Sequence, residues 1–325
     1  MIPIDPDDYH LSRPESVHSP GLLIFHDQLD ANLREMLRVA GSPDRLRPHC
    51  KTHKTREIIE LQLNLGITRH KCATLREAEM LAACGVEDIL IAYQQVGPNL
   101  ERLVALLNRF PGRKFSTLID DPRSLEQLSA ALQQHGRTID VFLDVDSGMG
   151  RTGIPVGEEA VQLYEMICLD PSVDVRGLHW YDGHHRDSDL QQRRLAVESA
   201  WKPLVEFRNR LVMQGFPVPT VVAAGTGSFP ILAEQAEPGL ELSPGTITYF
   251  DRGYWEQFPD MNYRPALAIL TRVVSCRRPG YLTLDLGHKS CAADPPAGSR
   301  LFFPELPDAV EFGQTEEHLV LQTDR

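Results

Sequence analysis

The chain has 325 residues, a length that suits one large domain or a barrel with a small companion domain. Apolar residues make up 42% and charged residues 24%, as in ordinary globular proteins, so a disordered chain is excluded. The formal net charge of -12 excludes nucleic acid as the expected partner, because phosphate backbones select basic surfaces, but it is compatible with a small anion in a locally positive pocket.

The sequence also indicates the compartment. The first 20 residues contain no apolar run of the kind found in a signal peptide, and the apolar runs elsewhere are too short for a membrane span. The 6 cysteines form no CxxC pair and no dense disulfide pattern. We therefore expect a cytoplasmic protein with free thiols and no membrane partner.

Apolar runs of strand length alternate with amphipathic, helix-like segments along most of the chain. The expected strands cover residues 45–49, 70–73, 88–93, 115–119, 139–145, 173–181, 221–225 and 246–250. The expected helices cover residues 56–65, 75–83, 100–109, 124–135, 158–168 and 190–213. Eight strands separated by helices indicate an α/β fold, a parallel (β/α)8 TIM-type barrel that we place at residues 17–250.

Two segments depart from the simple barrel pattern, and a doubly wound open sheet fits the same pattern. Residues 229–240 are only weakly helical, and residues 22–25 would add a strand outside the eight. After about residue 251, alternating runs separated by Pro and Gly indicate antiparallel strands at residues 266–275, 281–286 and 317–322. We therefore expect a second, smaller, mainly antiparallel β domain at residues 251–325, completed by residues 1–16.

The densest polar string follows the first expected strand, where residues 47–54 read RPHCKTHK. In a barrel, the carboxyl ends of the strands open into the active site. A lysine that is partly desolvated there, such as Lys51, has a lowered pKa and becomes a nucleophile toward an aldehyde. A basic surface loop explains this segment equally well when it is considered alone.

Three more strings follow later strands. Gly225, Thr226, Gly227 and Ser228 form a turn whose amides and hydroxyls suit a phosphate, although such turns are common. Residues 144–153, DVDSGMGRTG, place Arg151 in a tight loop and lack the spacing of a calcium-binding EF-hand loop. Residues 178–187, LHWYDGHHRD, offer imidazoles and carboxylates for a divalent metal, but a polar rim of the pocket is the more common role.

Taken in order, the four strings resemble the D-threonine aldolase and D-serine dehydratase group of pyridoxal-phosphate (PLP) enzymes, which have the alanine racemase fold type. The similarity runs from about residue 23 to residue 318, and RPHxKxHK is its most specific part. It implies that Lys51 is the Schiff-base lysine and that His53 lies beside the reacting centre. It also implies contacts of Arg151 with the phenolic side of the cofactor and of Tyr181 with the pyridine ring. The phosphate cup would consist of Gly225, Thr226, Gly227 and Ser228.

Two departures from the family pattern matter. Ala223 and Ala224 stand where aldolases tend to carry glycine. Relatives also end in a strand that bears a His-x-Asp or His-x-Cys metal pair, whereas this chain stops at Arg325, before such a pair. We therefore expect a truncated chain or one without that divalent metal site, and its metal ligands are unknown. The resemblance further implies a homodimer.

These features together predict a lyase that acts on a small amino acid, a D-configured β-hydroxy amino acid. Lys51 would hold PLP and serve as the α-proton base, and His53 would take the proton of the β-hydroxyl. Aldol cleavage, giving glycine and an aldehyde, ranks slightly ahead of dehydration to a keto acid and ammonia. An amino acid racemase, a non-catalytic PLP carrier and an inactive paralogue are the remaining alternatives.

Overall fold

The structure is a computed structural model that describes residues 2–324. The chain packs as two compact units, a larger one, Arg34–Ile247, and a smaller one made of residues 2–33 and 248–324. The domain limits expected at residues 17 and 250 stay a prediction. Within the described residues, no helix is both long and apolar enough to cross a membrane.

The larger unit contains a seven-stranded parallel sheet in the order β2-β3-β4-β5-β6-β7-β8. Its strands are β2 (Arg69–Cys72), β3 (Asp88–Ile91), β4 (Lys114–Ile119), β5 (Ile139–Val145), β6 (Val173–Trp180), β7 (Thr220–Ala223) and β8 (Leu240–Leu242). Neighbouring strands of the sheet are parallel and also consecutive along the chain. Each pair is therefore joined by a crossover connection of the same kind. A patch of the core consists of side chains from β3, β4, β5 and β7, namely Leu90, Leu118, Phe142 and Val222.

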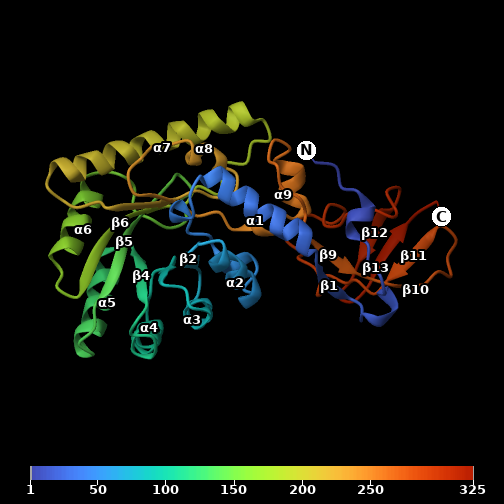
Figure 1. Cartoon of the computed structure of the whole chain (residues 1–325), viewed down its shortest axis with the longest axis horizontal. Helices are drawn as coiled ribbons and strands as arrows, with labels where there is room; N and C mark the ends of the chain where they lie inside the picture. The colour runs from blue at the N-terminus through green and yellow to red at the C-terminus, as the bar shows by residue number, and fades with distance from the viewer. Residues whose placement is uncertain (1, 325) are drawn as a thin grey trace. The chain divides into compact units, whose positions relative to one another are not determined.

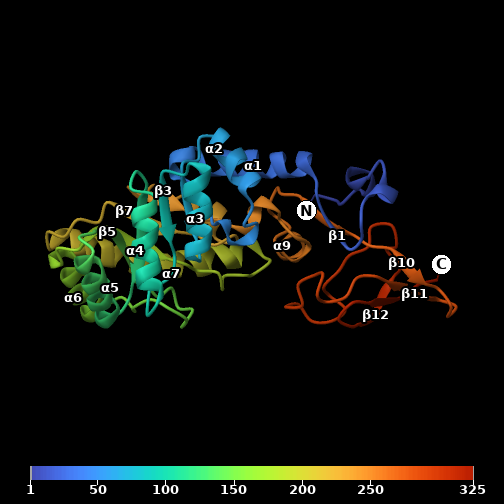
Figure 2. The same cartoon turned by 90° about the horizontal axis from the view of Figure 1, so that it is seen from below.

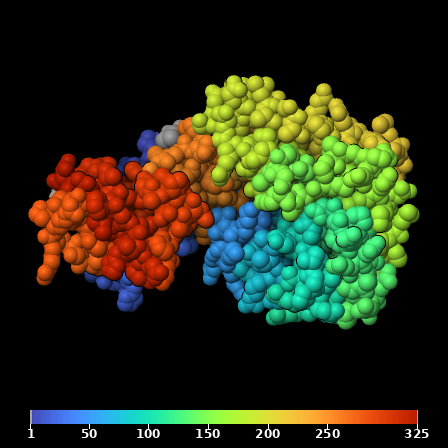
Figure 3. Space-filling model, turned by 180° about the vertical axis from the view of Figure 1, so that it is seen from behind, coloured from blue at the N-terminus to red at the C-terminus, as the bar shows by residue number. Residues whose placement is uncertain are grey.

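Helices connect these strands, and the six expected helices begin and end within two residues of their predicted bounds, whereas the sequence pattern did not predict α1. The helices of this part of the chain are α1 (His26–Ala40), α2 (Arg56–Asn64), α3 (Leu75–Cys84), α4 (Asn99–Arg109), α5 (Pro122–Gln134), α6 (Glu158–Leu169), α7 (Leu190–Met213) and α8 (Phe229–Ala233). Asp121 caps α5 by accepting from two backbone N–H groups, and Gly85 ends α3 at a φ of 99°. In Figure 1, α3 to α6 follow one another in the order of the strands they connect. Figure 3 shows this teal-to-green stretch as a continuous surface.

The closed barrel of eight regular strands is not what the structure shows. The first expected strand, 45–49, is irregular because Pro48 has no N–H to donate. It still makes one parallel bridge on each side, from Leu46 to Leu242 in β8 and from His49 to Lys71 in β2. The strand expected at 246–250 is wrong: Thr246–Thr248 form a 3-10 turn, and the eighth position belongs to the earlier β8.

The smaller unit is mainly antiparallel, as predicted. A two-stranded sheet pairs β1 (Gly21–Ile24) with β9 (Leu267–Leu270), which confirms the extra strand expected near residues 22–25. A four-stranded sheet follows the order β10-β11-β13-β12, and β10 to β12 lie together in Figure 2. The remaining elements of this unit are α9 (Arg252–Gln257), β10 (Val273–Ser275), β11 (Tyr281–Leu284), β12 (Val310–Gln314) and β13 (Leu319–Gln322).

Candidate active site

Three cationic side chains of the larger unit converge on one aromatic ring. Tyr181 follows β6 directly, and the Nζ atoms of Lys51 and Lys71 lie 5.0 Å and 5.7 Å from its ring centroid. The guanidinium carbon of Arg151, in the loop after β5, lies 5.1 Å from the same centroid. Each separation is within the range of a cation–π contact. The carboxyl side of the sheet therefore concentrates positive charge in a protein with a net charge of -12.

Lys51 is presented by a short 3-10 turn, Cys50–Thr52, that follows the bridging segment 45–49. The Nδ1 atom of His49 accepts from the backbone N–H of Lys51 at 3.2 Å and fixes the start of this turn. Partial desolvation, followed by the Arg151 guanidinium, lowers the pKa of Lys51. The side chain nevertheless stays accessible to solvent. An accessible amine with a lowered pKa is suited to nucleophilic attack on an aldehyde.

His53 ends the same turn in an uncharged state. Burial lowers the pKa of its imidazole to about 4, and its Nδ1 accepts from the backbone N–H of Thr55 at 3.2 Å. The imidazole is therefore neutral at neutral pH, the form in which it takes up a proton.

Buried polar side chains from three strands form a connected series of contacts. Asp144 in β5 and the Nδ1 of His179 in β6 lie 2.7 Å apart, and the Nε2 of His179 lies 3.5 Å from the Nζ of Lys71 in β2. Gln94 donates to the second oxygen of Asp144 at 3.1 Å. Burial lowers the pKa of His179, against the effect of Asp144. This carboxylate–imidazole–amine arrangement fixes the orientation of the His179 ring.

The turn from residue 225 to residue 228 is buried, and a carboxylate accepts hydrogen bonds from its first and last residues. One oxygen of Asp182 accepts from the Gly225 N–H at 2.9 Å and from the Ser228 hydroxyl at 2.7 Å. The backbone N–H groups of Thr226, Gly227 and Ser228 donate to no protein acceptor within the described residues. Three consecutive N–H groups without a protein partner form a ready binding site for an anion.

The same turn lies directly against the aromatic ring of Tyr181. A Cβ atom on Gly225 would lie 3.4 Å from Tyr181 Cε2 and 3.4 Å from Gly183 Cα. These are van der Waals distances, so the turn and the aromatic ring are adjacent.

Comparison with known proteins shows the family of the chain. Residues 24–253 match the model of the family "Alanine racemase, N-terminal domain", and residues 266–325 match "Putative serine dehydratase domain". This chain belongs to the alanine racemase-like family. It is 33% identical over 289 residues to D-threonine aldolase from an Arthrobacter species, covering 86% of this chain and 75% of the relative. It is 28% identical over 292 residues to 3-hydroxy-D-aspartate aldolase from Paracoccus denitrificans, with shares of 86% and 74%.

A solved structure agrees with this assignment. D-threonine aldolase from Filomicrobium marinum superposes with a TM-score of 0.87 at 29% identity, covering 95% of this chain and 83% of that chain. D-threo-3-hydroxyaspartate dehydratase from Delftia sp. HT23 is 25% identical over 239 residues, with shares of 73% and 62%. The chain is therefore an enzyme, a lyase of the PLP-dependent aldolase and dehydratase group within the alanine racemase-like family.

The structure gathers most of the side chains predicted for the site. Lys51, Arg151 and Tyr181 meet, and the turn from Gly225 to Ser228 touches Tyr181. The roles assigned to these residues and to His53 remain proposals. Sequence reasoning overlooked Lys71 and His179. The overlooked signal was the strand RHKC, because a strand buried on both faces ordinarily reads as an apolar run.

The imidazoles considered as metal ligands do not assemble a metal site in the described residues. The rings of His184 and His185 stack on each other at 4.1 Å. The one group with metal-ligand distances within residues 2–324 lies elsewhere and consists of His49, Cys50 and Glu77, with ligand atoms within 4.8 Å of one another.

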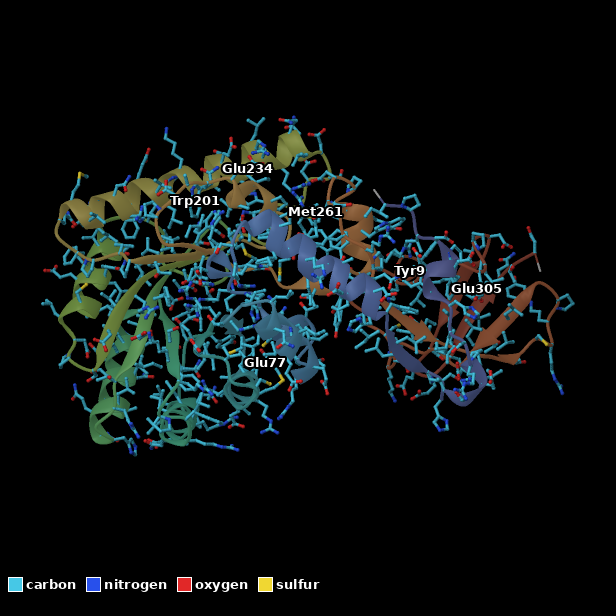
Figure 4. The ribbon with its side chains drawn as sticks, viewed as in Figure 1. Tyr9, Glu77, Trp201, Glu234, Met261 and Glu305 are labelled. Atoms are coloured by element: carbon cyan, nitrogen blue, oxygen red, sulfur yellow. The ribbon has the colours of Figure 1, made fainter. Side chains whose placement is uncertain are left out.

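Protein contacts account for that group without a metal. Glu77, labelled on α3 in Figure 4, accepts from the Ala73 N–H at 2.7 Å and pairs with the Lys54 ammonium at 3.0 Å. Burial raises the pKa of the Cys50 thiol, which disfavours the thiolate that binds metals.

Proposed function

We propose that this protein cleaves a D-configured β-hydroxy amino acid to glycine and an aldehyde, as a D-threonine aldolase-like lyase. One observation carries the proposal. The amines of Lys51 and Lys71 and the Arg151 guanidinium converge on Tyr181, beside a buried turn with three N–H groups that have no protein partner. This arrangement would suit an aromatic aldehyde that carries anionic groups, and PLP has that chemistry.

The residues fit PLP group by group. Lys51, the accessible amine, would carry the aldehyde carbon, and Tyr181 would lie next to the pyridine ring. Arg151 would face the phenolic oxygen. The N–H groups of the turn would hold the phosphate, a role for which they have no competing acceptor. When bound, the cofactor supplies an electron sink for the bonds of the substrate α-carbon.

The protein's own groups move the protons of the cleavage. Neutral His53 would accept the proton of the substrate β-hydroxyl. The hydroxyl oxygen would then form the aldehyde C=O bond as the Cα–Cβ bond breaks. The electron pair of the broken Cα–Cβ bond would stay with the α-carbon. The Lys51 ammonium, once the substrate amine has displaced it, would return a proton to that carbon and leave glycine. Atoms balance, because threonine equals glycine plus acetaldehyde.

Dehydration is the second candidate, supported by the similarity to D-threo-3-hydroxyaspartate dehydratase. Lys51 would then take the α-proton, and hydroxide would leave the β-carbon. Addition of water to the resulting enamine yields a keto acid and ammonia. Both reactions use the same residues, so the products decide between them. A cytoplasmic homodimer, with the domain limits given above, is also part of the proposal.

The test is an absorbance spectrum of the purified protein with PLP, before and after addition of D-threonine or D-serine. Wild type should show the absorbance of a lysine–cofactor imine, which Lys51→Ala removes and the exposed control Lys202→Ala keeps. Release of an aldehyde would identify aldol cleavage, and release of ammonia would identify dehydration. A wild-type spectrum without the imine band would overturn the proposal.

A further inference from the structure

Lys71 is a buried amine without a carboxylate counter-ion. Its side chain is 2% exposed, and its amine lies within hydrogen-bond distance of the Nε2 of His179, at 3.5 Å. Among the described residues it forms no ion pair with an acidic side chain. A charged ammonium in such a place is expensive unless an anion compensates it. The position therefore calls for an anionic ligand or a neutral amine.

The surroundings of Lys71 allow both its neutral and its charged form near neutral pH. Burial, as the largest effect, lowers the pKa of Lys71 to about 7. Charged and titratable groups face it from the bridging segment, from β5 and from β6: Arg47, His49, Lys51, Asp144, His179 and Asp182. The cations among them lower the pKa and the two carboxylates raise it. An additional anion in the site would shift the balance to the ammonium form.

Bound PLP would bring such an anion near Lys71. In PLP, the phenolic oxygen and the phosphate arm sit on the two ring carbons that flank the aldehyde. With the aldehyde at Lys51 and the phosphate at the turn after β7, the phenolic oxygen would face the remaining cations. The remaining cations around Tyr181 are Arg151 and Lys71.

We propose that Lys71 is a cofactor-contacting residue whose ammonium, together with Arg151, balances the phenolic oxygen of PLP. In this role His179, held by Asp144, is a positioning residue that orients the Lys71 amine. The inference rests on the proposed function, because it takes PLP as the ligand. The Lys71 ammonium would be a second positive charge in the cofactor site. Its charge depends on pH, whereas the guanidinium of Arg151 stays charged.

The role has a measurable electrostatic consequence. An ammonium near the lysine–cofactor imine disfavours protonation of the imine nitrogen, so it lowers the imine pKa. Loss of the Lys71 charge should raise the midpoint of the imine titration by on the order of one pH unit. The same loss should weaken PLP binding by roughly tenfold or more.

The experiment titrates imine absorbance with pH and measures the PLP dissociation constant for wild type, Lys71→Met, Lys71→Arg and the exposed control Lys202→Met. The inference predicts a raised midpoint and weaker binding for Lys71→Met, and wild-type behaviour for the control. Lys71→Arg should keep a midpoint near that of wild type because it keeps the charge. Wild-type midpoint and affinity in Lys71→Met would overturn the inference.

A second measurement is made on the wild-type protein, in which Lys71 is intact. The 15N resonance of the Lys71 amine is titrated in wild-type protein with and without PLP, and Lys71→Arg serves only to assign the signal. PLP should raise the pKa of Lys71, and an unchanged pKa would overturn the inference. If wild type forms no imine with PLP, the proposed function itself fails, and this inference fails with it.

Discussion

Lys51, Lys54 and Lys71 carry the same amine in three different surroundings. Lys54 is mostly exposed and pairs with Glu77 at 3.0 Å. Lys51 is accessible but has a lowered pKa, and Lys71 is buried beside an imidazole. Because the cost of charge rises with burial, the three lysines suit different roles, as a surface cation, a nucleophile and a titratable counter-charge.

At residue scale, two adjacent alanines offer a matched test of backbone strain. Ala224 has a φ of 78°, a left-handed conformation that costs an L-residue about 1–2 kcal/mol, whereas its neighbour Ala223 lies in the regular strand β7. Both side chains are fully buried. Glycine at either site removes one buried methyl group and adds the same freedom to the unfolded chain. Only Ala224→Gly also relieves strain.

We therefore expect the free energy of unfolding of Ala224→Gly to exceed that of Ala223→Gly by about 1–2 kcal/mol. Denaturant unfolding of the two variants, followed by far-UV circular dichroism, measures this difference. Equal losses in both variants would contradict a strained conformation at Ala224.

At the scale of elements, the irregular segment 45–49 is fastened by a buried arginine. Arg47 is fully buried and pairs with Glu241 in β8 at 2.5 Å and with Asp88 in β3 at 2.8 Å. Burial raises the pKa of Asp88, but Arg47 outweighs it and holds that pKa below the ordinary value. The segment that presents Lys51 is thus tied to β8 and β3 of the sheet by side chains as well as by its two bridges.

Removing this arginine takes the fully buried partner from two carboxylates, which keep the partly exposed Arg69 at 3.6 Å from Glu241 and Arg176 at 3.3 Å from Asp88. We expect Arg47→Met to lower the free energy of unfolding by about 3–5 kcal/mol, as for other broken buried ion pairs. The exposed pair of Lys202 with Glu206 is the control, and Lys202→Met should cost less than about 1 kcal/mol. Denaturant titration at neutral pH measures both. Similar small losses in the two variants would show that the buried network contributes little.

The elements differ in how well their sequence predicts them. Periodicity located α7 and β5 with their observed bounds, because long patterned segments carry a strong local signal. It placed the last parallel strand at residues 246–250, whereas β8 lies at Leu240–Leu242, since three residues carry too little pattern. In the site, too, only residues with a strong local sequence signal were predicted. Local strings gave Lys51 and Arg151, whereas the partnership of Lys71 with His179 depends on strands that are distant in sequence.

At the scale of the whole molecule, burial keeps several histidines neutral. Burial lowers the pKa of His53 to about 4 and that of His70 to about 3, and it lowers the pKa of His49 and His179 as well. In the unfolded chain these imidazoles titrate near their ordinary value of about 6.5. The unfolded state therefore binds more protons than the native state between about pH 6.5 and pH 4. The native state loses stability as the pH falls through this window.

His70 allows the contribution of one buried histidine to this pH dependence to be measured, because it is not one of the proposed reacting groups. It is fully buried, and its Nε2 lies 2.9 Å from the amide oxygen of Gln62. In the wild type a single such histidine contributes a slope of up to about 1.4 kcal/mol per pH unit between pH 4 and pH 6.5. His70→Gln should reduce the slope of unfolding free energy against pH by that amount, whatever its effect on packing at pH 7. The exposed His10→Gln serves as the control, and an unchanged slope in His70→Gln would show that His70 is protonated in the native state.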